Sequence, residues 1–327
     1  MTAHPSIPKV SLGIYPTPLQ PALRFGGRLG HKIWLKRDDL CGLALGGNKI
    51  RKLEYLLADA LAKGYDYIIT TGAAQSNHAT LTAAACRRLG LEVELILKGR
   101  GVTEPLGNLL LDQLLDVPVT MIDADDYAPV YAAIDQKCRG LTAAGRKPYV
   151  IPVGGSVPLG ALGYVDCVAE MAAQAETMGF KIDHIVACSG SGGTHAGLLL
   201  GAARLNPAPK VTAVMAAPEE DFQKTIFDLT LAAADILGQK TSLTLDDVIL
   251  KDYIGPGYAQ MSRAGLSAIK TLASLEGIFI DPVYTGKTLA GLIDLCQKGY
   301  FRPDENIVFI HSGGAPALFA IPTTPAD

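Results

Sequence analysis

The sequence predicts an α/β protein with mostly parallel sheets that are covered by helices on both faces. Short runs rich in β-branched residues alternate with amphipathic helical runs along almost the whole chain, an order typical of parallel sheets. Several of the strand-like runs are nearly all apolar, as expected for strands buried on both faces. At 327 residues the chain exceeds what one hydrophobic core usually covers, so we expect a two-lobed, three-layer αβα arrangement.

Nine runs have the length and composition of strands: 32–39, 65–72, 92–99, 118–123, 148–155, 184–190, 210–217, 277–281 and 306–314. Helical runs lie between them, with apolar residues at three- and four-residue spacing; examples are 52–64, 78–90, 106–116 and 162–176. Glycine and proline cluster at 152–160. This cluster indicates either a crossing between lobes or an active-site loop.

Composition argues against several classes of protein. The net charge is −3, the basic residues are scattered and only 6% of residues are aromatic, which disfavours nucleic-acid binding. The six cysteines form no C-x-x-C pair and are expected to be reduced thiols, and the six histidines lack ligand spacing, so no metal is expected. The N-terminal MTAHPSIPKV lacks the layout of a secretion signal and no run predicts a transmembrane helix, so we expect a cytoplasmic protein.

Chemistry is expected in loops, because ligands of open parallel sheets bind beyond the carboxyl ends of the strands. Five loop motifs stand out: GGNK (46–49), TTGAAQSNH (70–78), SGSGGTH (189–195), DPVYTGK (281–287) and HSGGAP (311–316). SGSGGTH suits a phosphate group, because glycines let backbone amides converge and the following helix adds a positive dipole end. The alternative is a glycine loop that holds no phosphate.

Other nucleotide and nucleophile motifs do not fit these loops. Gly190 and Gly192 begin a G-x-G-x-x-G pattern, but its last position is His195. Residues 286–288 lack the leading glycine of a Walker A loop, and Ser191 lacks the preceding glycine of a nucleophile elbow. A nicotinamide-dependent dehydrogenase is therefore disfavoured.

Lys49 is unusual because it stands behind two glycines and Asn48, at the start of an amphipathic helix, where a cation opposes the helix dipole. A lysine that forms an imine should be partly desolvated and close to other positive potential, since both favour the neutral amine. Together with a phosphate-binding loop, such a lysine indicates pyridoxal 5′-phosphate (PLP). The alternative is a solvated lysine at a helix end. The next two cations, Arg51 and Lys52, are expected to be surface charges of the helix.

Ten segments occur in order between residues 15 and 319: YPTPL, KRDD, GGNKIRKLEYLLADAL, QSNH, PYVIPVGG, GALGY, SGSGGTHAG, PGY, DPVYTGK and IHSGGAPALF. On these segments the chain resembles the PLP-dependent, fold type II group of D-cysteine desulfhydrases and 1-aminocyclopropane-1-carboxylate (ACC) deaminases. The resemblance implies a homodimer that acts on a small amino-acid substrate. It also implies a large PLP-binding lobe (1–50 and 161–327) and a small lobe (51–160), with PLP in the cleft between them.

The resemblance also implies roles for individual residues. Lys49 would be the Schiff-base lysine, with Asn48 beside it in the cofactor site, and Asn77 would hydrogen-bond the ring hydroxyl oxygen of PLP. The remaining PLP contacts are expected from seven residues: Gly190, Ser191, Gly192, Gly193 and Thr194 at the phosphate, and Thr285 and Ser312 near the ring nitrogen.

For the substrate, the resemblance implies contacts with six residues: Gln75, Ser76, Asn77, His78, Tyr258 and Tyr284. Ser76, Asn77 and His78 open a helix whose free amides suit the substrate carboxylate. Lys49, Tyr284 and Ser76 are the expected catalytic residues, and either Lys49 or Tyr284 would remove the α-proton. The alternatives are a capping or core role for His78, and loop packing for Tyr258.

Two positions bear on the reaction. ACC deaminases typically have a glutamate where this chain has Thr285, and a bulky apolar residue where it has Ser312, whereas D-cysteine desulfhydrases place hydroxyl residues at both. A carboxylate near the pyridine nitrogen keeps it protonated and strengthens the electron sink, while a hydroxyl leaves the sink weaker. We therefore expect a D-cysteine desulfhydrase that forms pyruvate, sulfide and ammonia by α,β-elimination. An L-cysteate sulfo-lyase, an ACC deaminase and a non-catalytic PLP-binding protein remain alternatives.

Overall fold

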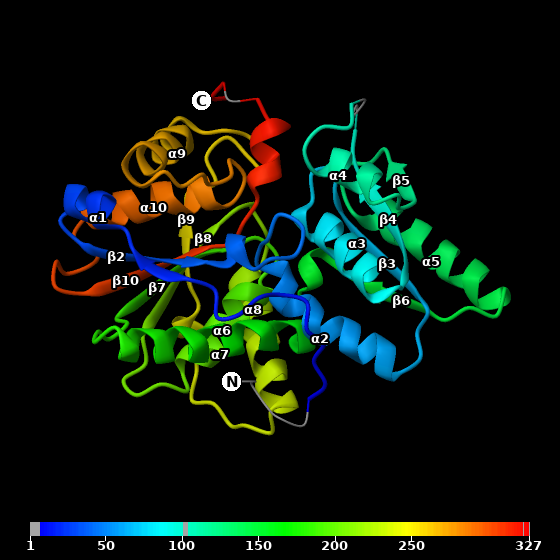
Figure 1. Cartoon of the computed structure of the whole chain (residues 1–327), viewed down its shortest axis with the longest axis horizontal. Helices are drawn as coiled ribbons and strands as arrows, with labels where there is room; N and C mark the ends of the chain where they lie inside the picture. The colour runs from blue at the N-terminus through cyan, green and yellow to red at the C-terminus, as the bar shows by residue number, and fades with distance from the viewer. Residues whose placement is uncertain (1–6, 101–103, 323, 327) are drawn as a thin grey trace.

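The computed structural model describes residues 7–100, 104–322 and 324–326. Two sheets of mostly parallel strands form two lobes that lie side by side, with the smaller lobe on the right in Figure 1. Helices cover both faces of each sheet. The predicted α/β class, with two lobes of three αβα layers, is confirmed.

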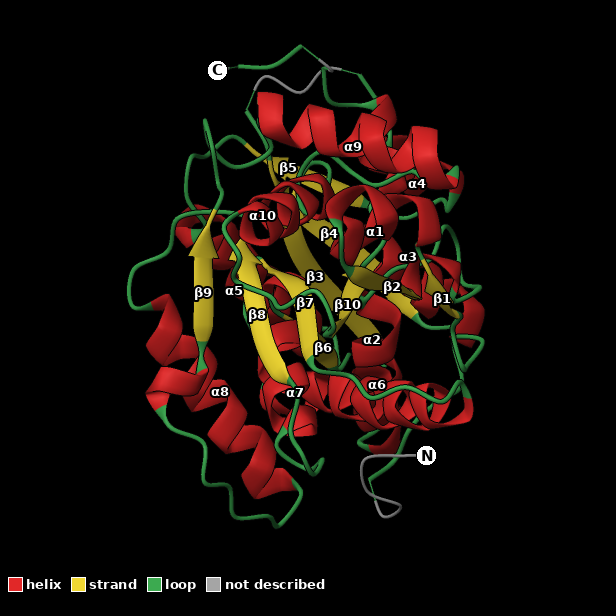
Figure 2. Ribbon diagram, turned by 90° about the vertical axis from the view of Figure 1, so that its left-hand side faces the viewer, coloured by secondary structure: helices red, strands yellow, loops and turns green. Residues whose placement is uncertain are grey.

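The sheet of the larger lobe has the strand order β1-β2-β10-β7-β8-β9. Its strands are β1 (Leu19–Pro21), β2 (Lys32–Arg37), β7 (His184–Ser189), β8 (Lys210–Met215), β9 (Ile249–Asp252) and β10 (Asn306–His311). Neighbouring strands are parallel except for β1, which is antiparallel to β2. One face of the sheet packs against α1 (Leu23–Leu29), α9 (Arg263–Glu276) and α10 (Thr285–Gln297). The other face packs against α6 (Pro158–Thr177), α7 (Gly193–Ala202) and α8 (Phe222–Ile236), and Figure 2 shows the two layers above and below the strands.

The sheet of the smaller lobe has the order β5-β4-β3-β6, and all of its strands are parallel. The strands are β3 (Tyr67–Ala73), β4 (Glu92–Lys98), β5 (Val119–Ile122) and β6 (Pro148–Ile151). One face carries a core with α2 (Lys49–Ala62) and α3 (Asn77–Leu89), and the other packs against α5 (Ala128–Ala143). The short helix α4 (Asn108–Leu114) lies against α3.

Eight of the nine predicted strands are present within a few residues, and the prediction of a strand at 277–281 is wrong. Ile278 and Ile280 are buried in the core with α9 and α10, whereas Phe279 between them is 65% exposed. The apolar residues alternate there because they pack into this core, and the sheet beside it is formed by other strands. Strands β1 and β9, of 3 and 4 residues, were not predicted.

Helix α2 packs against both α6 of the larger lobe and α3 of the smaller one, so a boundary between residues 50 and 51 lies inside a helix. The chain returns to the larger lobe through the 3-10 helix Val153–Gly155, which joins β6 to α6. The division into 1–50 plus 161–327 and 51–160 stays a prediction.

Within the described ranges, no helix is both long and apolar enough to cross a membrane. All six cysteines are free thiols, as the sequence predicts.

Candidate active site

A cavity of about 750 Å³ lies where the carboxyl ends of both sheets face each other. Loops after β3, β4, β5 and β6 line it from the smaller lobe, and loops after β7, β8 and β10 line it from the larger lobe. The convergence of strand ends on one space is the arrangement expected of a ligand site in parallel sheets.

Most of the predicted site residues lie on the wall of this cavity. They are Asn48, Lys49, Ser76, Asn77, His78, Gly190, Ser191, Gly192, Thr194, Tyr258, Tyr284 and Ser312. Three predicted residues are not part of the wall: Gln75, Gly193 and Thr285.

The bend before α2 is fixed by backbone contacts. A Cβ at Gly46 would lie 1.9 Å from the Asp39 carbonyl oxygen, and Gly46 has φ +70°, so only glycine fits this position. The backbone amide of Asn48 donates to the Ser312 carbonyl (3.0 Å), and the side-chain nitrogen of Asn48 donates to the Thr194 hydroxyl (3.0 Å). The bend is thereby joined to the loops after β7 and β10, and Lys49 opens onto the cavity.

Desolvation in the surrounding protein lowers the pKa of Lys49 to about 8, although Cys188 and Asp281 act in the opposite direction. Its Nζ donates to the Asn48 side-chain oxygen at 2.9 Å. Burial is therefore the cause of the lowered pKa of Lys49. The nearby positive potential that the sequence analysis expected does not contribute to it. For Lys52 the pKa falls well below its usual value through burial and then through the charge of Lys49.

The prediction that Arg51 and Lys52 are surface charges is wrong, because they are only 2% and 1% exposed. Both lobes cover α2, so its polar face is buried as well. The Arg51 guanidinium donates to both carboxylate oxygens of Asp38 (2.9 and 2.8 Å) and of Glu170 (2.9 Å each). Burial alone would raise the pKa of Asp38, but Arg51 holds it below its usual value. This ion network anchors the start of α2, two residues after Lys49.

The loop after β7 forms a compact polar cradle at the start of α7. The Gly193 amide donates to the Ser156 hydroxyl (3.1 Å), which lies 2.8 Å from the Ser191 hydroxyl. Lys52 donates to Ser156 (3.2 Å) and to the Gly154 carbonyl (3.1 Å). A Cβ at Gly193 would lie 2.8 Å from the Lys52 Nζ. The absence of a side chain at Gly193 therefore allows the Lys52 amine to approach this loop.

Two further polar side chains in the cavity wall are buried without a partner. The Ser189 hydroxyl and both ring nitrogens of His195 have no hydrogen-bond partner among the described residues. Burial lowers the pKa of His195 to about 3, so its ring is neutral. Buried polar groups without partners are uncommon, and these two indicate that the cavity is built for a polar ligand.

Helix α3 begins at the opposite side of the cavity. The Ser76 hydroxyl caps it by accepting from the Ala79 amide (3.2 Å). The Thr70 hydroxyl donates to the Ile151 carbonyl (2.8 Å), so the His78 Nε2 atom, 2.9 Å away, must donate to Thr70. Nε2 of His78 therefore carries a proton, and because burial followed by the charges of Lys49 and Lys52 lowers the pKa of His78 well below the usual value, its ring is neutral.

The hydroxyls of Tyr258 and Tyr284 form a 2.6 Å hydrogen bond inside the cavity. Burial and then Tyr258 raise the pKa of Tyr284 well above its usual value, so it stays protonated. The loop that carries Tyr258 is held by Lys287 of α10, whose Nζ donates to the Gly257 carbonyl. Helix α10 thus positions both tyrosines.

Thr285 and Ser312 have different surroundings. The Thr285 hydroxyl accepts from the Asp281 amide (2.8 Å) and donates to the Asp281 carboxylate, so its hydrogen-bonding capacity is used inside the protein. Ser312 lies on the cavity wall. Of the two hydroxyl residues, only Ser312 faces the cavity.

Sequence analysis missed several residues of the wall. Lys98, Tyr127 and Tyr131 of the smaller lobe and Glu219 of the larger lobe line the same cavity. The Lys98 Nζ lies 4.7 Å from the centre of the Tyr127 ring. Lys98 ends β4 and Glu219 follows β8, so their position after strands was the available signal. Pro152, Val153, Gly154 and Ser156 also line this cavity, and the same glycine-rich segment carries the chain between the lobes.

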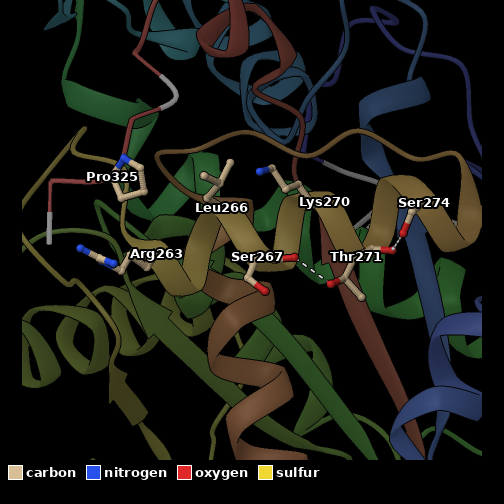
Figure 3. Close-up of a pocket in the computed structure, with 7 residues that line it drawn as sticks. All are labelled: Arg263, Leu266, Ser267, Lys270, Thr271, Ser274 and Pro325. Carbon is tan, nitrogen blue, oxygen red and sulfur yellow. Dashed lines mark hydrogen bonds between the residues drawn. The ribbon is translucent and has the colours of Figure 1, made fainter.

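A second hollow of about 500 Å³ lies on the outer side of α9 (Figure 3). It is lined by Arg263, Leu266, Ser267, Lys270, Thr271, Ser274 and Pro325. The Thr271 and Ser274 hydroxyls donate to carbonyls of the same helix (2.7 and 3.1 Å). Because it contains none of the predicted residues, it is not the candidate active site.

Comparisons with known proteins show the family of the chain. The family model described as "Pyridoxal-phosphate dependent enzyme" matches residues 10–313. A D-cysteine desulfhydrase of Klebsiella pneumoniae (strain 342) is 44% identical over 321 residues, covering 96% of each chain. A putative ACC deaminase of Pyrococcus abyssi is 40% identical over 313 residues, covering 95% of this chain and 93% of its own. A crystal structure of an ACC deaminase homologue superposes with a TM-score of 0.91 at 41% identity, covering 96% and 94% of the two chains. The chain belongs to the family of pyridoxal-phosphate-dependent enzymes.

Proposed function

We propose that this chain is a D-cysteine desulfhydrase, which converts D-cysteine and water to pyruvate, hydrogen sulfide and ammonia in the cavity between the lobes. The observation that carries the proposal is a lysine with a pKa of about 8 in a cavity that also holds a glycine cradle and a serine hydroxyl at the end of β10. The 44% identity to a protein named D-cysteine desulfhydrase supports it.

The cavity fits PLP. The proposed covalent attachment is to Lys49, whose pKa of about 8 leaves about half of its amine uncharged at pH 8. The phosphate would lie in the cradle of Gly190, Ser191, Gly192 and Thr194. The buried Lys52 amine donates to Ser156 beside that cradle, and the unpartnered Ser189 and His195 side chains lie in the same wall. Asn77 and Ser312 would face the polar atoms of the ring.

Bound PLP supplies an electron sink that lowers the barrier to breaking bonds at the α-carbon of an amino acid. We propose Lys49 as the base that removes the α-proton. Its pKa of about 8 is close to neutral, whereas Tyr284 has a pKa raised well above its usual value and keeps its proton. Tyr284 would instead donate a hydrogen bond, with Tyr258 holding its orientation at 2.6 Å.

The start of α3 would bind the substrate carboxylate. The first-turn amides of a helix have no acceptor within the helix and favour an anion. Ser76 and Asn77 line the cavity at that point. Gln75 is excluded from this role, because its side chain is bound to Leu106 and Asn108.

Ser312 is the residue that we propose for the contact with the pyridine nitrogen. A hydroxyl there leaves the nitrogen without the nearby carboxylate that would keep it protonated. Elimination of sulfide, a good leaving group, needs less carbanion stabilisation than the opening of a cyclopropane ring. Because Thr285 is bound to Asp281, Ser312 alone carries this part of the argument.

Two other reactions have support from particular observations. ACC deamination is supported by the relative from Pyrococcus abyssi and by the superposed crystal structure. Elimination of sulfite from L-cysteate would need a cation for the sulfonate, and Lys98 lies in the cavity wall.

One experiment separates the three reactions. Purified protein is given D-cysteine, L-cysteine, L-cysteate and ACC in parallel, and pyruvate, 2-oxobutyrate, sulfide and sulfite are measured. The proposal predicts the fastest turnover with D-cysteine, with equal amounts of pyruvate and sulfide. Faster formation of 2-oxobutyrate from ACC, or of sulfite from L-cysteate, would overturn the substrate while leaving the cofactor site intact.

A homodimer and a cytoplasmic location, both expected from the resemblance and the sequence, complete the proposal. Sedimentation equilibrium at several protein concentrations tests the dimer. A mass equal to one chain of 34.4 kDa at all concentrations would contradict it.

A further inference from the structure

A buried asparagine on α4, which the proposed reaction does not use, contacts one of the proposed PLP ligands. Asn108 is the first residue of α4 and is 2% exposed. Its side-chain nitrogen lies 2.7 Å from the Asn77 side-chain oxygen and 3.0 Å from the Gln75 carbonyl oxygen. Its backbone amide donates to the Gln75 side-chain oxygen (2.9 Å).

These contacts fix the orientation of each amide group. The Gln75 carbonyl can only accept, so the atom of Asn108 that faces it must be the NH₂ group. The same NH₂ group faces Asn77, and the atom of Asn77 beside it must therefore be the oxygen. The Gln75 side chain is fixed in the same way, because it lies between the donating amide of Asn108 and the accepting carbonyl of Leu106 (2.9 Å).

Backbone geometry holds Asn108 in this place. Gly107 has φ +54° and ψ −122°, a conformation that is essentially restricted to glycine. A Cβ at Gly107 would lie 2.6 Å from the Gln75 side-chain oxygen and 2.8 Å from the Pro316 carbonyl oxygen. The start of α4 is thus tightly packed against both the loop before α3 and the segment after β10.

We propose that Asn108 is a positioning residue that makes Asn77 a hydrogen-bond donor toward the cavity. With its oxygen directed at Asn108, the Asn77 side chain has a fixed orientation and both of its N–H donors are left for a ligand. A donor of this kind favours an acceptor, which for PLP is the ionised form of the ring hydroxyl. The inference rests on the proposed contact between Asn77 and that oxygen. Asn108 then helps to set the charge of the bound cofactor without touching it.

The test is a pH titration of the visible absorption of the PLP-loaded enzyme, together with the dissociation constant for PLP. Asn108→Ala and the milder Asn108→Ser remove one or both donors, and Gln113→Ala at an exposed position of the same helix is the matched control. Asn77→Asp tests the ligand itself, because a carboxylate opposes the ionised ring oxygen. We expect the midpoint of the titration to rise by about one pH unit in Asn108→Ala, with about tenfold weaker PLP binding, from the loss of one oriented hydrogen bond. Gln113→Ala should behave as wild type.

The outcomes separate this inference from the proposed role of Asn77. If Asn77→Asp moves the midpoint and neither Asn108 variant does, Asn77 binds the cofactor without help from Asn108 and the inference is wrong. If Asn77→Asp also leaves the midpoint unchanged, the contact between Asn77 and PLP fails and the inference fails with it. A raised midpoint in Asn108→Ser, which keeps a small polar side chain, supports the inference even if Asn108→Ala proves unstable.

Discussion

Replacement of Asp112 by asparagine should change how the stability of this protein depends on pH. Asp112 lies one turn after Asn108 on α4 and is 1% exposed, and neither carboxylate oxygen has a hydrogen-bond partner among the described residues. Burial raises its pKa from 3.8 to about 7, and the neighbouring Thr80 hydroxyl offsets the shift only in part. The folded protein therefore favours the neutral carboxyl group.

The sign and size of the effect follow from this shift. A carboxyl group with a raised pKa in the folded state binds its proton more tightly there than in the unfolded chain. Its contribution to stability is therefore lost as the pH rises from about 4 to about 7. A shift of about 3 units at 1.36 kcal/mol per unit corresponds to about 4 kcal/mol over that interval. Asp112→Asn, which cannot ionise, should not show this loss.

The assay is urea unfolding of the wild type and the variant at pH 5 and pH 8, in the same excess of PLP. Between these pH values the wild type should lose about 3 kcal/mol of unfolding free energy relative to Asp112→Asn. The matched control is Asp116→Asn, at an exposed position just beyond α4, which should follow the wild type. Parallel pH dependence of Asp112→Asn and wild type would refute a buried carboxyl group with a raised pKa.

Three further changes test separate parts of the site. Arg51→Met removes the charged partner of the buried Asp38 carboxylate, while Glu170 keeps its ion pair with Lys36, and should cost about 3–5 kcal/mol of stability in urea unfolding; an unchanged midpoint would contradict the ion network. Lys287→Met removes the hydrogen bond that holds the loop of Tyr258. It should lower kcat on D-cysteine about tenfold and leave the PLP dissociation constant unchanged. A change in PLP binding with an unchanged kcat would show that Lys287 does not act through Tyr258. Thr285→Val should cost about 1–3 kcal/mol of stability and leave the cofactor spectrum unchanged. Ser312→Ala should change the cofactor spectrum and leave the stability unchanged. A spectral change in Thr285→Val, without one in Ser312→Ala, would show that Thr285 is the residue at the ring.

The fold was largely predictable because most strands and helices have a clear period in the sequence. The run 277–281 shows the limit, since Ile278 and Ile280 are buried by α9 and α10 and not by sheet neighbours. Local pattern reports that a residue is buried, but it does not report what covers it.

The site was predictable where its chemistry is local, as in the glycine bend before Lys49 and the glycine loop after β7. Arg51 and Lys52 were misjudged because the sequence does not show that both lobes cover α2. Ser156 joins the cradle from a different loop, and that contact exists only in three dimensions. Thr285 looked equivalent to Ser312 until the structure placed its hydroxyl on Asp281.

The most direct test of the central claim is the release of pyruvate and sulfide from D-cysteine by the wild type and by Lys49→Ala. We expect equal amounts of both products from the wild type. With Lys49→Ala we expect release at the level of a protein-free control and loss of the visible absorption of lysine-bound PLP. Turnover by Lys49→Ala at the wild-type rate, or a wild type that forms no sulfide from D-cysteine, would contradict the account.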